Sequence, residues 1–159
     1  MSRIIGFGHV GIYVKDMELM ADFYSNFIGL TITDRSKDGR LTFLSSRPHE
    51  EHHELLLVRN PDKRTELEHF SFRLASLEDL KDFYRRISES GYTITRTFNH
   101  GNALGCYFLD PEGNQMEVYW STGLDVPQPR ADTIDFGLPE DDIHSILEKM
   151  PRSVEGQVG

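Results

Sequence analysis

Two histidines and one glutamate stand at spacings that suit a single divalent metal ion. His9 and His69 each open a segment with strand-like alternation, and 60 residues separate them. Glu117 lies in a later segment of the same kind. Two histidines and one carboxylate bind one side of a metal and leave the opposite positions open, as in non-heme Fe(II) oxygenases. The three residues therefore predict a metal centre at which a substrate and dioxygen bind together.

A simpler interpretation treats the same residues as structural. His9 and His69 would then be half-buried strand histidines, and Glu117 a surface carboxylate at a sheet edge. Residue types alone leave both interpretations open, because histidine has many roles besides metal binding. The repeat described next favours the metal, since packing gives no reason for a histidine at the same place twice.

The chain repeats itself at an offset of 60 residues, with two residues inserted partway through the second copy. A histidine opens both copies, and in the last segment Glu54 is matched with Glu117. The matched segments are 9–14 with 69–74, 22–24 with 82–84, 29–33 with 91–95, 42–44 with 107–109, and 54–57 with 117–120.

Each copy has the periodicity of one strand, one helix and three further strands. Apolar and polar residues alternate over 9–14, which is typical of a strand with one buried face. Apolar residues then recur at helical spacings, and Gly29 and Gly91 suit the helix C-termini. Three short β-branched or aromatic runs follow in each copy. The sequence thus predicts an α+β fold of two tandem βαβββ modules.

The predicted elements also give the three residues a common position. A helix covers only one face of its sheet, so the alternation leaves the other face for His9, His69 and Glu117. Two curved sheets would enclose a cavity there, in which the three side chains converge.

Composition limits the classes of protein that fit. The chain has 159 residues, of which 38% are hydrophobic and 27% charged, as expected for one globular core. Its formal charge of -9 and the lack of a basic aromatic patch argue against nucleic acid as a partner. With Cys106 as the only cysteine there is no disulfide framework, and no apolar run suits a signal peptide or a membrane span. We expect a cytoplasmic protein.

We expect residues 1–121 to form one domain, with modules at about 4–60 and 66–120. The remaining residues, 122–159, form a C-terminal extension. Pro127 and Pro129 predict an extended stretch at its start, and residues 139–149 have the pattern of one short helix. The last residues, from 152, are expected to be disordered.

Several of these segments resemble a known family. Gly8-His9, Glu68-His69 and the run from Asp110 to Glu117 are similar to motifs of the vicinal oxygen chelate (glyoxalase/bleomycin resistance/dioxygenase) superfamily. The resemblance covers about residues 4–120. It implies the fold and the metal site, but the superfamily contains several reactions.

Further motifs resemble one branch, the type I extradiol catechol dioxygenases. That signature has a histidine, a tyrosine and a ligand glutamate, which here are His100, Tyr107 and Glu117. His53 precedes an aliphatic strand as the branch's acid-base histidine does. The segment 120–129 resembles the tail of small extradiol enzymes. Two positions depart from the signature, Cys106 and Phe98, and the chain has about half the length of the two-domain enzymes, which implies the single-domain type.

The resemblance implies ring cleavage of a catechol-type aromatic diol by O2 at Fe(II), with Mn(II) an alternative that shares the ligand set. His53 would be the acid-base residue, with its neighbour His52 the weaker candidate. His100 would donate to a bound substrate oxygen, and Tyr107 would position substrate or oxygen. By analogy we also expect a homo-oligomer and a role in aromatic compound catabolism.

Two other functions are considered. In a glyoxalase-like isomerase or epimerase, Glu54 would be a fourth metal ligand, and the metal would suit bound water better than dioxygen. His100 and Tyr107 would then have no task. A metal-free binding protein for an aromatic ligand is the second alternative, which the presence of His9, His69 and Glu117 argues against.

Overall fold

The computed structural model describes residues 8–63 and 67–153. They form two compact units, which are described separately. The first contains residues 8–63 with the turn Asp110–Gly113, and the second contains Leu67–Leu109 with the residues from Asn114 onward. The expected disorder of the last residues concerns mainly 154–159, which lie outside the described residues.

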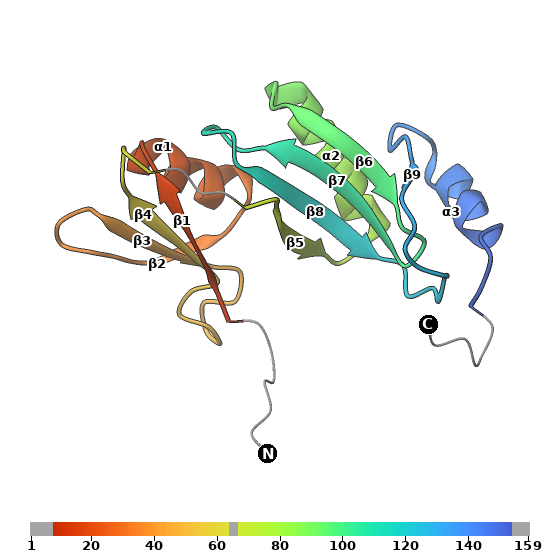
Figure 1. Cartoon of the computed structure of the whole chain (residues 1–159), viewed down its shortest axis with the longest axis horizontal. Coiled ribbons are helices and arrows are strands. Elements are labelled where there is room, and N and C mark those ends of the chain that lie inside the picture. The colour runs from red at the N-terminus through yellow and green to blue at the C-terminus, as the bar shows by residue number, and fades with distance from the viewer. Residues whose placement is uncertain (1–7, 64–66, 154–159) are drawn as a thin grey trace, which may run out of the picture. The chain divides into compact units, whose positions relative to one another are not determined.

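The first unit is a four-stranded sheet with one helical segment (Figure 1). Its strand order is β1-β4-β3-β2, in which β1 and β4 run parallel and the other neighbours run antiparallel. Its elements are β1 (Val10–Val14), α1 (Met17–Asp22), a π-helical turn η1 (Phe23–Phe27), β2 (Thr31–Arg35), β3 (Leu41–Ser45) and β4 (Leu55–Arg59).

The second unit repeats this topology and adds one strand and one helix. Its strand order is β5-β8-β7-β6-β9, again with the first two strands parallel. The predicted α+β fold with two βαβββ modules is therefore confirmed. Its elements are β5 (Phe70–Leu74), α2 (Leu77–Ser90), β6 (Ile94–Asn99), β7 (Ala103–Leu109), β8 (Gln115–Ser121), β9 (Asp132–Thr133) and α3 (Glu140–Glu148).

Capping residues fix where both module helices begin. The side chains of Asp16 and Ser76 accept hydrogen bonds from backbone N–H groups in the first turns of α1 and α2. Gly91 ends α2 in the left-handed conformation, at a φ of 77°, as predicted for a helix C-terminus. The first helix differs from the expectation, because its second half is π-helical and Ile28 donates to Phe23, five residues back.

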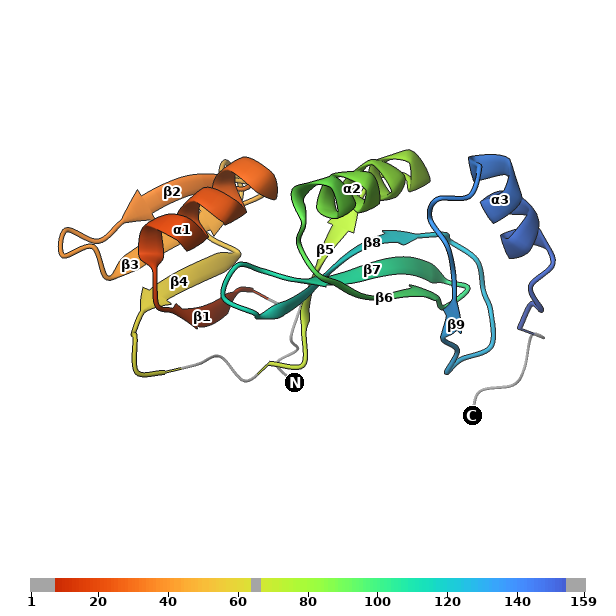
Figure 2. The ribbon, with the colours of Figure 1, turned by 90° about the horizontal axis from the view of Figure 1, so that it is seen from above.

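The two module helices, α1 and α2, each cover one face of their own sheet (Figure 2). In the first unit the covered face is built from Ile12, Val14, Leu55 and Leu57, all of which are buried. Alternation places residues of the opposite parity, such as Tyr13 and Leu56, on the other face. That uncovered face is where the sequence predicts the chemistry.

The strand registers correct one part of the predicted repeat. Val10 pairs with Leu55 in the first unit, and Phe70 pairs with Met116 in the second. Since Val10 and Phe70 each follow the module's first histidine, the position equivalent to Glu117 is Leu56. The match of Glu54 with Glu117 was therefore wrong by two residues.

The C-terminal extension belongs to the second unit. Strand β9 pairs with β6 and forms the edge of the sheet, and α3 follows β9. Among the described residues, no helix has the length and apolarity needed to cross a lipid bilayer.

Candidate metal centre

Glu117 and His69 meet on the uncovered face of the second sheet. Residue 117 lies in β8 beside Ser71 of β5, and His69 immediately precedes β5. His69 Nε2 is 3.7 Å from Glu117 Oε2. Ser71 Oγ donates a hydrogen bond to the same carboxylate oxygen. The carboxylate is held beside an imidazole nitrogen although Glu117 is only 7% exposed.

Gly105 makes room for this carboxylate. It lies in β7, and a Cβ atom added to it would be 2.1 Å from Glu117 Oε1, far inside van der Waals contact. A glycine is required here by the close approach of the side chain. Nothing local in the sequence distinguishes this residue from a glycine that only shapes a loop.

Tyr107 joins the same cluster. It pairs with Glu117 across β7 and β8, and its ring centroid is 5.1 Å from that of His69. Burial, the charge of Glu117 and a hydrogen bond to that carboxylate raise the pKa of the Tyr107 phenol. The hydroxyl therefore stays protonated at neutral pH and donates to Glu117.

Glu68 and Arg96 support the cluster from one side. The Glu68 carboxylate contacts His69 Nδ1 and forms an ion pair with Arg96. Hydrogen bonds from Arg96 and His69 lower the pKa of Glu68. The Arg96 guanidinium also lies 4.4 Å from the centroid of the Tyr107 ring. Because Glu68 occupies Nδ1, the Nε2 atom of His69 is left for another partner.

Arg96 was missed because of a bulge. The register between β6 and β7 shifts between Ile94 and Arg96, so simple alternation does not predict that Arg96 pairs with Tyr107. Glu68 had a usable signal, namely a carboxylate directly before a predicted metal histidine.

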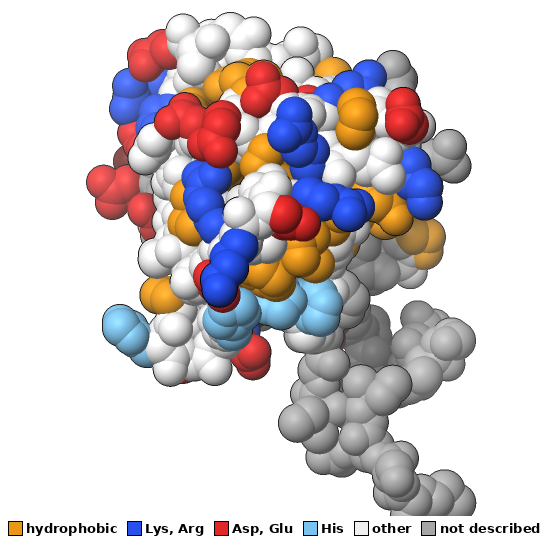
Figure 3. Space-filling view, turned by 90° about the vertical axis from the view of Figure 1, so that its left-hand side faces the viewer, with side chains coloured by type: hydrophobic (Ala, Val, Ile, Leu, Met, Phe, Trp, Pro, Cys, Tyr) orange, Lys and Arg blue, Asp and Glu red, His pale blue; other side chains and the backbone are white. Residues whose placement is uncertain are grey.

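His9 and His53 meet in the first unit. Their ring centroids are 4.3 Å apart, and His53 also contacts the ring of Phe43 at 5.1 Å. Figure 3 shows histidine side chains side by side next to hydrophobic ones. Burial, followed by the charges of His9 and His52, lowers the pKa of His53. His53 is thus kept neutral at physiological pH, as a proton acceptor must be.

His52 has further partners besides His53, whose Nδ1 is 3.1 Å from the Nδ1 of His52. Its Nε2 is 3.9 Å from Asp34, and its backbone carbonyl accepts a hydrogen bond from Thr33. Its side chain is 56% exposed. Of the two neighbouring histidines, His53 is the one whose ring contacts His9, at an interplanar angle of 47°.

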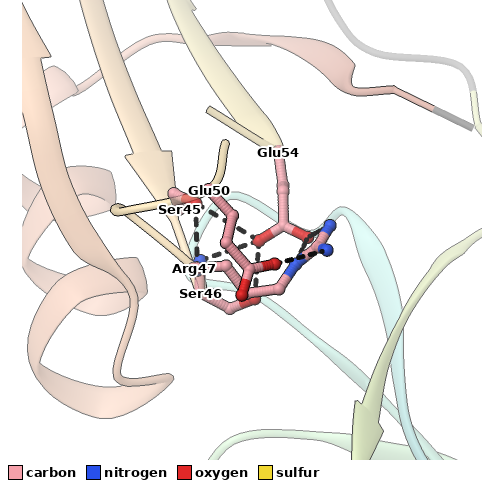
Figure 4. Close-up of polar contacts among 5 residues, drawn as sticks. All are labelled: Ser45, Ser46, Arg47, Glu50 and Glu54. Atoms are coloured by element: carbon pink, nitrogen blue, oxygen red, sulfur yellow. Dashed lines mark hydrogen bonds and ion pairs between the residues drawn. The ribbon is translucent and has the colours of Figure 1, made fainter. Parts of the chain in front are cut away.

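Glu54 is engaged elsewhere in the same unit (Figure 4). Arg47 donates to its Oε1 atom at 2.9 Å, and the backbone N–H of Ser46 donates to Oε2 at 2.8 Å. Partial burial alone would raise the pKa of Glu54, but the hydrogen bonds from Ser46 and Arg47 lower it overall. The carboxylate therefore closes the loop between β3 and β4.

His100 follows β6 and is held by the extension. Its Nδ1 is 2.5 Å from the carbonyl oxygen of Arg130. The ring of Phe98 contacts both His100, at 5.6 Å, and Tyr107, at 5.9 Å between centroids. Phe98 thus lies against both of these predicted catalytic residues.

The donor atoms suit a divalent metal. The second unit contains His69 and Glu117, and the first contains His9. Imidazole nitrogen and carboxylate oxygen are the ligand types of Fe(II) and Mn(II) sites with open positions. Over residues 8–63 and 67–153, no group of three or more His, Cys, Asp or Glu side chains is itself arranged around a metal position.

Comparison with known proteins identifies a family and several relatives. Residues 6–118 match the model of the Glyoxalase/Bleomycin resistance protein/Dioxygenase superfamily. A 1,2-dihydroxynaphthalene dioxygenase of Pseudomonas putida is 26% identical over 134 residues, covering 80% of this chain and 42% of the relative. A manganese-dependent 2,3-dihydroxybiphenyl 1,2-dioxygenase of Geobacillus genomosp. 3 is 28% identical, covering 82% and 40%. The chain thus spans about two fifths of the length of these relatives.

Other similar proteins are named for reactions other than dioxygenation. A glutathione transferase of Serratia marcescens is 24% identical, covering 70% of this chain and 77% of the relative. Among solved structures, lactoylglutathione lyase from Agrobacterium tumefaciens has a TM-score of 0.60 at 19% identity, covering 75% of this chain and 96% of that chain. At that identity the likeness establishes the fold alone.

Proposed function

Because the chain belongs to the Glyoxalase/Bleomycin resistance protein/Dioxygenase superfamily, we propose that it is an extradiol dioxygenase that inserts O2 into a catechol-type aromatic diol. The observation that carries the proposal is the cluster of His69, Glu117 and Tyr107 on one sheet face. In this cluster the protonated hydroxyl of Tyr107 is hydrogen-bonded to the Glu117 carboxylate. The named relatives that act on dihydroxynaphthalene and dihydroxybiphenyl support the substrate class.

The ligand set that we propose is His9, His69 and Glu117, with Fe(II) as the metal. Mn(II) is the alternative, and one relative is named as manganese-dependent. When bound, such a cation lowers the pKa of both diol hydroxyls and offers dioxygen a position beside the substrate. On the protein side, Glu68 and Ser71 orient two of the three donors through His69 Nδ1 and Glu117 Oε2.

His53 is proposed as the acid-base residue. Its lowered pKa keeps the imidazole neutral, so it can accept a hydroxyl proton and later return it. Tyr107 would position the substrate, since its protonated hydroxyl and its contact with Arg96 fix the ring. His100 would meet a substrate oxygen through Nε2.

The isomerase alternative requires Glu54 as a fourth ligand. In the structure this carboxylate is bound by Arg47 and Ser46, and Leu56 has the position equivalent to Glu117. An apolar residue at that position would supply no fourth ligand to a metal, which supports oxygen chemistry over an isomerase.

The decisive experiment is an activity assay on protein purified without oxygen and loaded with Fe(II). Oxygen uptake and a yellow ring-cleavage product are followed with catechol, 3-methylcatechol, 4-methylcatechol and 2,3-dihydroxybiphenyl. We expect one O2 consumed per product formed, and loss of turnover with metal retained in His53→Ala. His49→Ala, a change in the exposed part of the same loop, is the matched control. No uptake with any diol, together with hemithioacetal isomerisation in the presence of Ni(II) or Zn(II), contradicts the proposal.

A further inference from the structure

The C-terminal extension surrounds the predicted catalytic histidine His100. We propose that Gln128 is a positioning residue. Its side chain joins the backbone of His100 to the backbone of Arg130 and thereby fixes the His100 ring as the Nδ1–H tautomer. The catalytic consequence rests on the proposed function, whereas the tautomer itself can be measured without any reaction.

The tautomer follows from the partner of the ring. A backbone carbonyl can only accept hydrogen bonds, and Arg130 O is 2.5 Å from His100 Nδ1. The proton must therefore be on Nδ1 for this contact to be favourable. In the neutral ring, Nε2 then has a lone pair. His100 would accept a hydroxyl hydrogen bond from a diol through Nε2, and would donate one only as imidazolium.

A single amide holds both ends of this contact. Gln128 Nε2 donates to the backbone carbonyl of His100 at 2.5 Å, and Gln128 Oε1 accepts from the backbone N–H of Arg130 at 3.1 Å. The residue that presents the acceptor and the residue that bears the ring are thus tied by one side chain. Rotation of the His100 ring away from Arg130 O would break the hydrogen bond from Nδ1. Gln128 favours that hydrogen bond, because it keeps the backbones of His100 and Arg130 together.

Other parts of the extension restrain the same turn. Thr122 Oγ1 donates to the carbonyl of Gly101 at 2.6 Å. Gly101 has a φ of +80°, and a Cβ atom there would be 2.6 Å from Val126 Cγ1, so the turn packs closely on the extension. Strand β9 then pairs with β6 next to His100, at Phe98 and Asn99. These contacts hold the backbone of residues 98–101, and Gln128 links that backbone to Arg130, whose carbonyl oxygen meets the His100 ring.

The test is ¹⁵N NMR of the histidine rings in the full-length chain loaded with diamagnetic Zn(II). Two-bond ring correlations distinguish the Nδ1–H from the Nε2–H tautomer, and the His100 signals are assigned by their loss in His100→Gln. We expect the Nδ1–H form in the unmodified protein. We expect a shift toward the Nε2–H form in Gln128→Met, which keeps the side-chain length but removes the amide's hydrogen bonds to His100, Val126 and Arg130. Asp125→Asn, an exposed change in the same extension, is the control and should leave the tautomer unchanged.

The outcomes separate this inference from the proposed function. An Nε2–H tautomer in the unmodified protein, or an unchanged Nδ1–H form in folded Gln128→Met, overturns the role of Gln128. If Gln128→Met does not fold, the tautomer of the unmodified protein still decides whether Arg130 O accepts from the ring. Oxygen uptake that falls about tenfold in Gln128→Met but not in Asp125→Asn extends the role to turnover. If the Nδ1–H form is found but no diol gives oxygen uptake, the hydrogen bond from His100 to Arg130 O is supported. The dioxygenase assignment is then overturned.

Discussion

Gly105 is the residue on which the geometry of Glu117 depends most directly. We predict that Gly105→Ala displaces the carboxylate, since the new Cβ would overlap Glu117 Oε1 at 2.1 Å. Metal affinity should fall about 10- to 100-fold, by analogy with other changes that misplace a ligand, and the fold should lose about 1–3 kcal/mol from overpacking. Metal titration and thermal unfolding measure the two effects.

Gly11 offers a matched control for that substitution. It lies on the uncovered face of β1, and a Cβ atom there meets nothing closer than Leu56 at 3.9 Å. Gly11→Ala should therefore leave metal affinity unchanged. Equal effects of the two substitutions would mean that Gly105 matters only as a generic strand glycine.

His53 has a predicted signature in the pH profile. Burial and the neighbouring charges of His9 and His52 lower its pKa below the ordinary histidine value of 6.5. A base must be deprotonated to act, so kcat/KM should rise with pH, with the midpoint of the rise below pH 6.5. A bound cation would lower the midpoint further. The measurement is the acid limb of the kcat/KM profile, which should vanish in His53→Gln if that residue is the base, and persist if His52 is.

At the scale of elements, Glu54 serves the loop that joins β3 to β4. We predict that Glu54→Gln retains full metal content and lowers the midpoint of thermal unfolding by about 2–4 °C, because the bonds with Arg47 and Ser46 are weakened. Its pKa is lowered in the folded state, so its stabilisation is present above the ordinary value of 4.5 and is lost as pH falls through the lower folded value. The difference in melting temperature between the two proteins should therefore shrink in acid. Loss of metal in Glu54→Gln would instead support the isomerase alternative.

The elements themselves could be predicted because their periodicity is local. Alternation and helical spacing reflect which side chains face the core, and Gly91 marks the predicted end of the second helix. Features that depend on pairing between strands could not be predicted. The bulge before Arg96 and the register that pairs Val10 with Leu55 depend on contacts between strands, which local periodicity does not reveal.

The candidate site divides in the same way. His69, Glu117 and Tyr107 were predicted from residue type and motif, and the second unit brings them together. Gly105, Ser71 and Arg96 act through close contacts with them and have no signature of their own. Their part in the site follows from packing. At Gly105, for example, a single added Cβ atom would overlap the Glu117 carboxylate.

At the scale of the whole molecule, the repeated topology gives each module a histidine directly before its first strand, His9 before β1 and His69 before β5. The proposed centre uses both. We predict one metal ion per chain, and loss of that ion in His9→Ala as well as in Glu117→Ala, because two donors alone bind a hard divalent cation weakly. Metal analysis after anaerobic dialysis gives the stoichiometry. The rise in melting temperature on adding Fe(II) or Mn(II) should also disappear, since a ligand stabilises only the state that binds it.

Two histidines distant from the predicted chemistry serve as controls for this prediction. His49 is exposed in the loop after β3, and His144 is on α3, where it lies 3.5 Å from Glu140. His49→Ala and His144→Ala should keep one metal per chain and the full thermal shift. If His9→Ala keeps the metal while Glu117→Ala loses it, the ion is bound by the second unit alone. The first-unit pair of His9 and His53 would then have to act on the substrate rather than on the metal, and the dioxygenase mechanism would need a different third ligand.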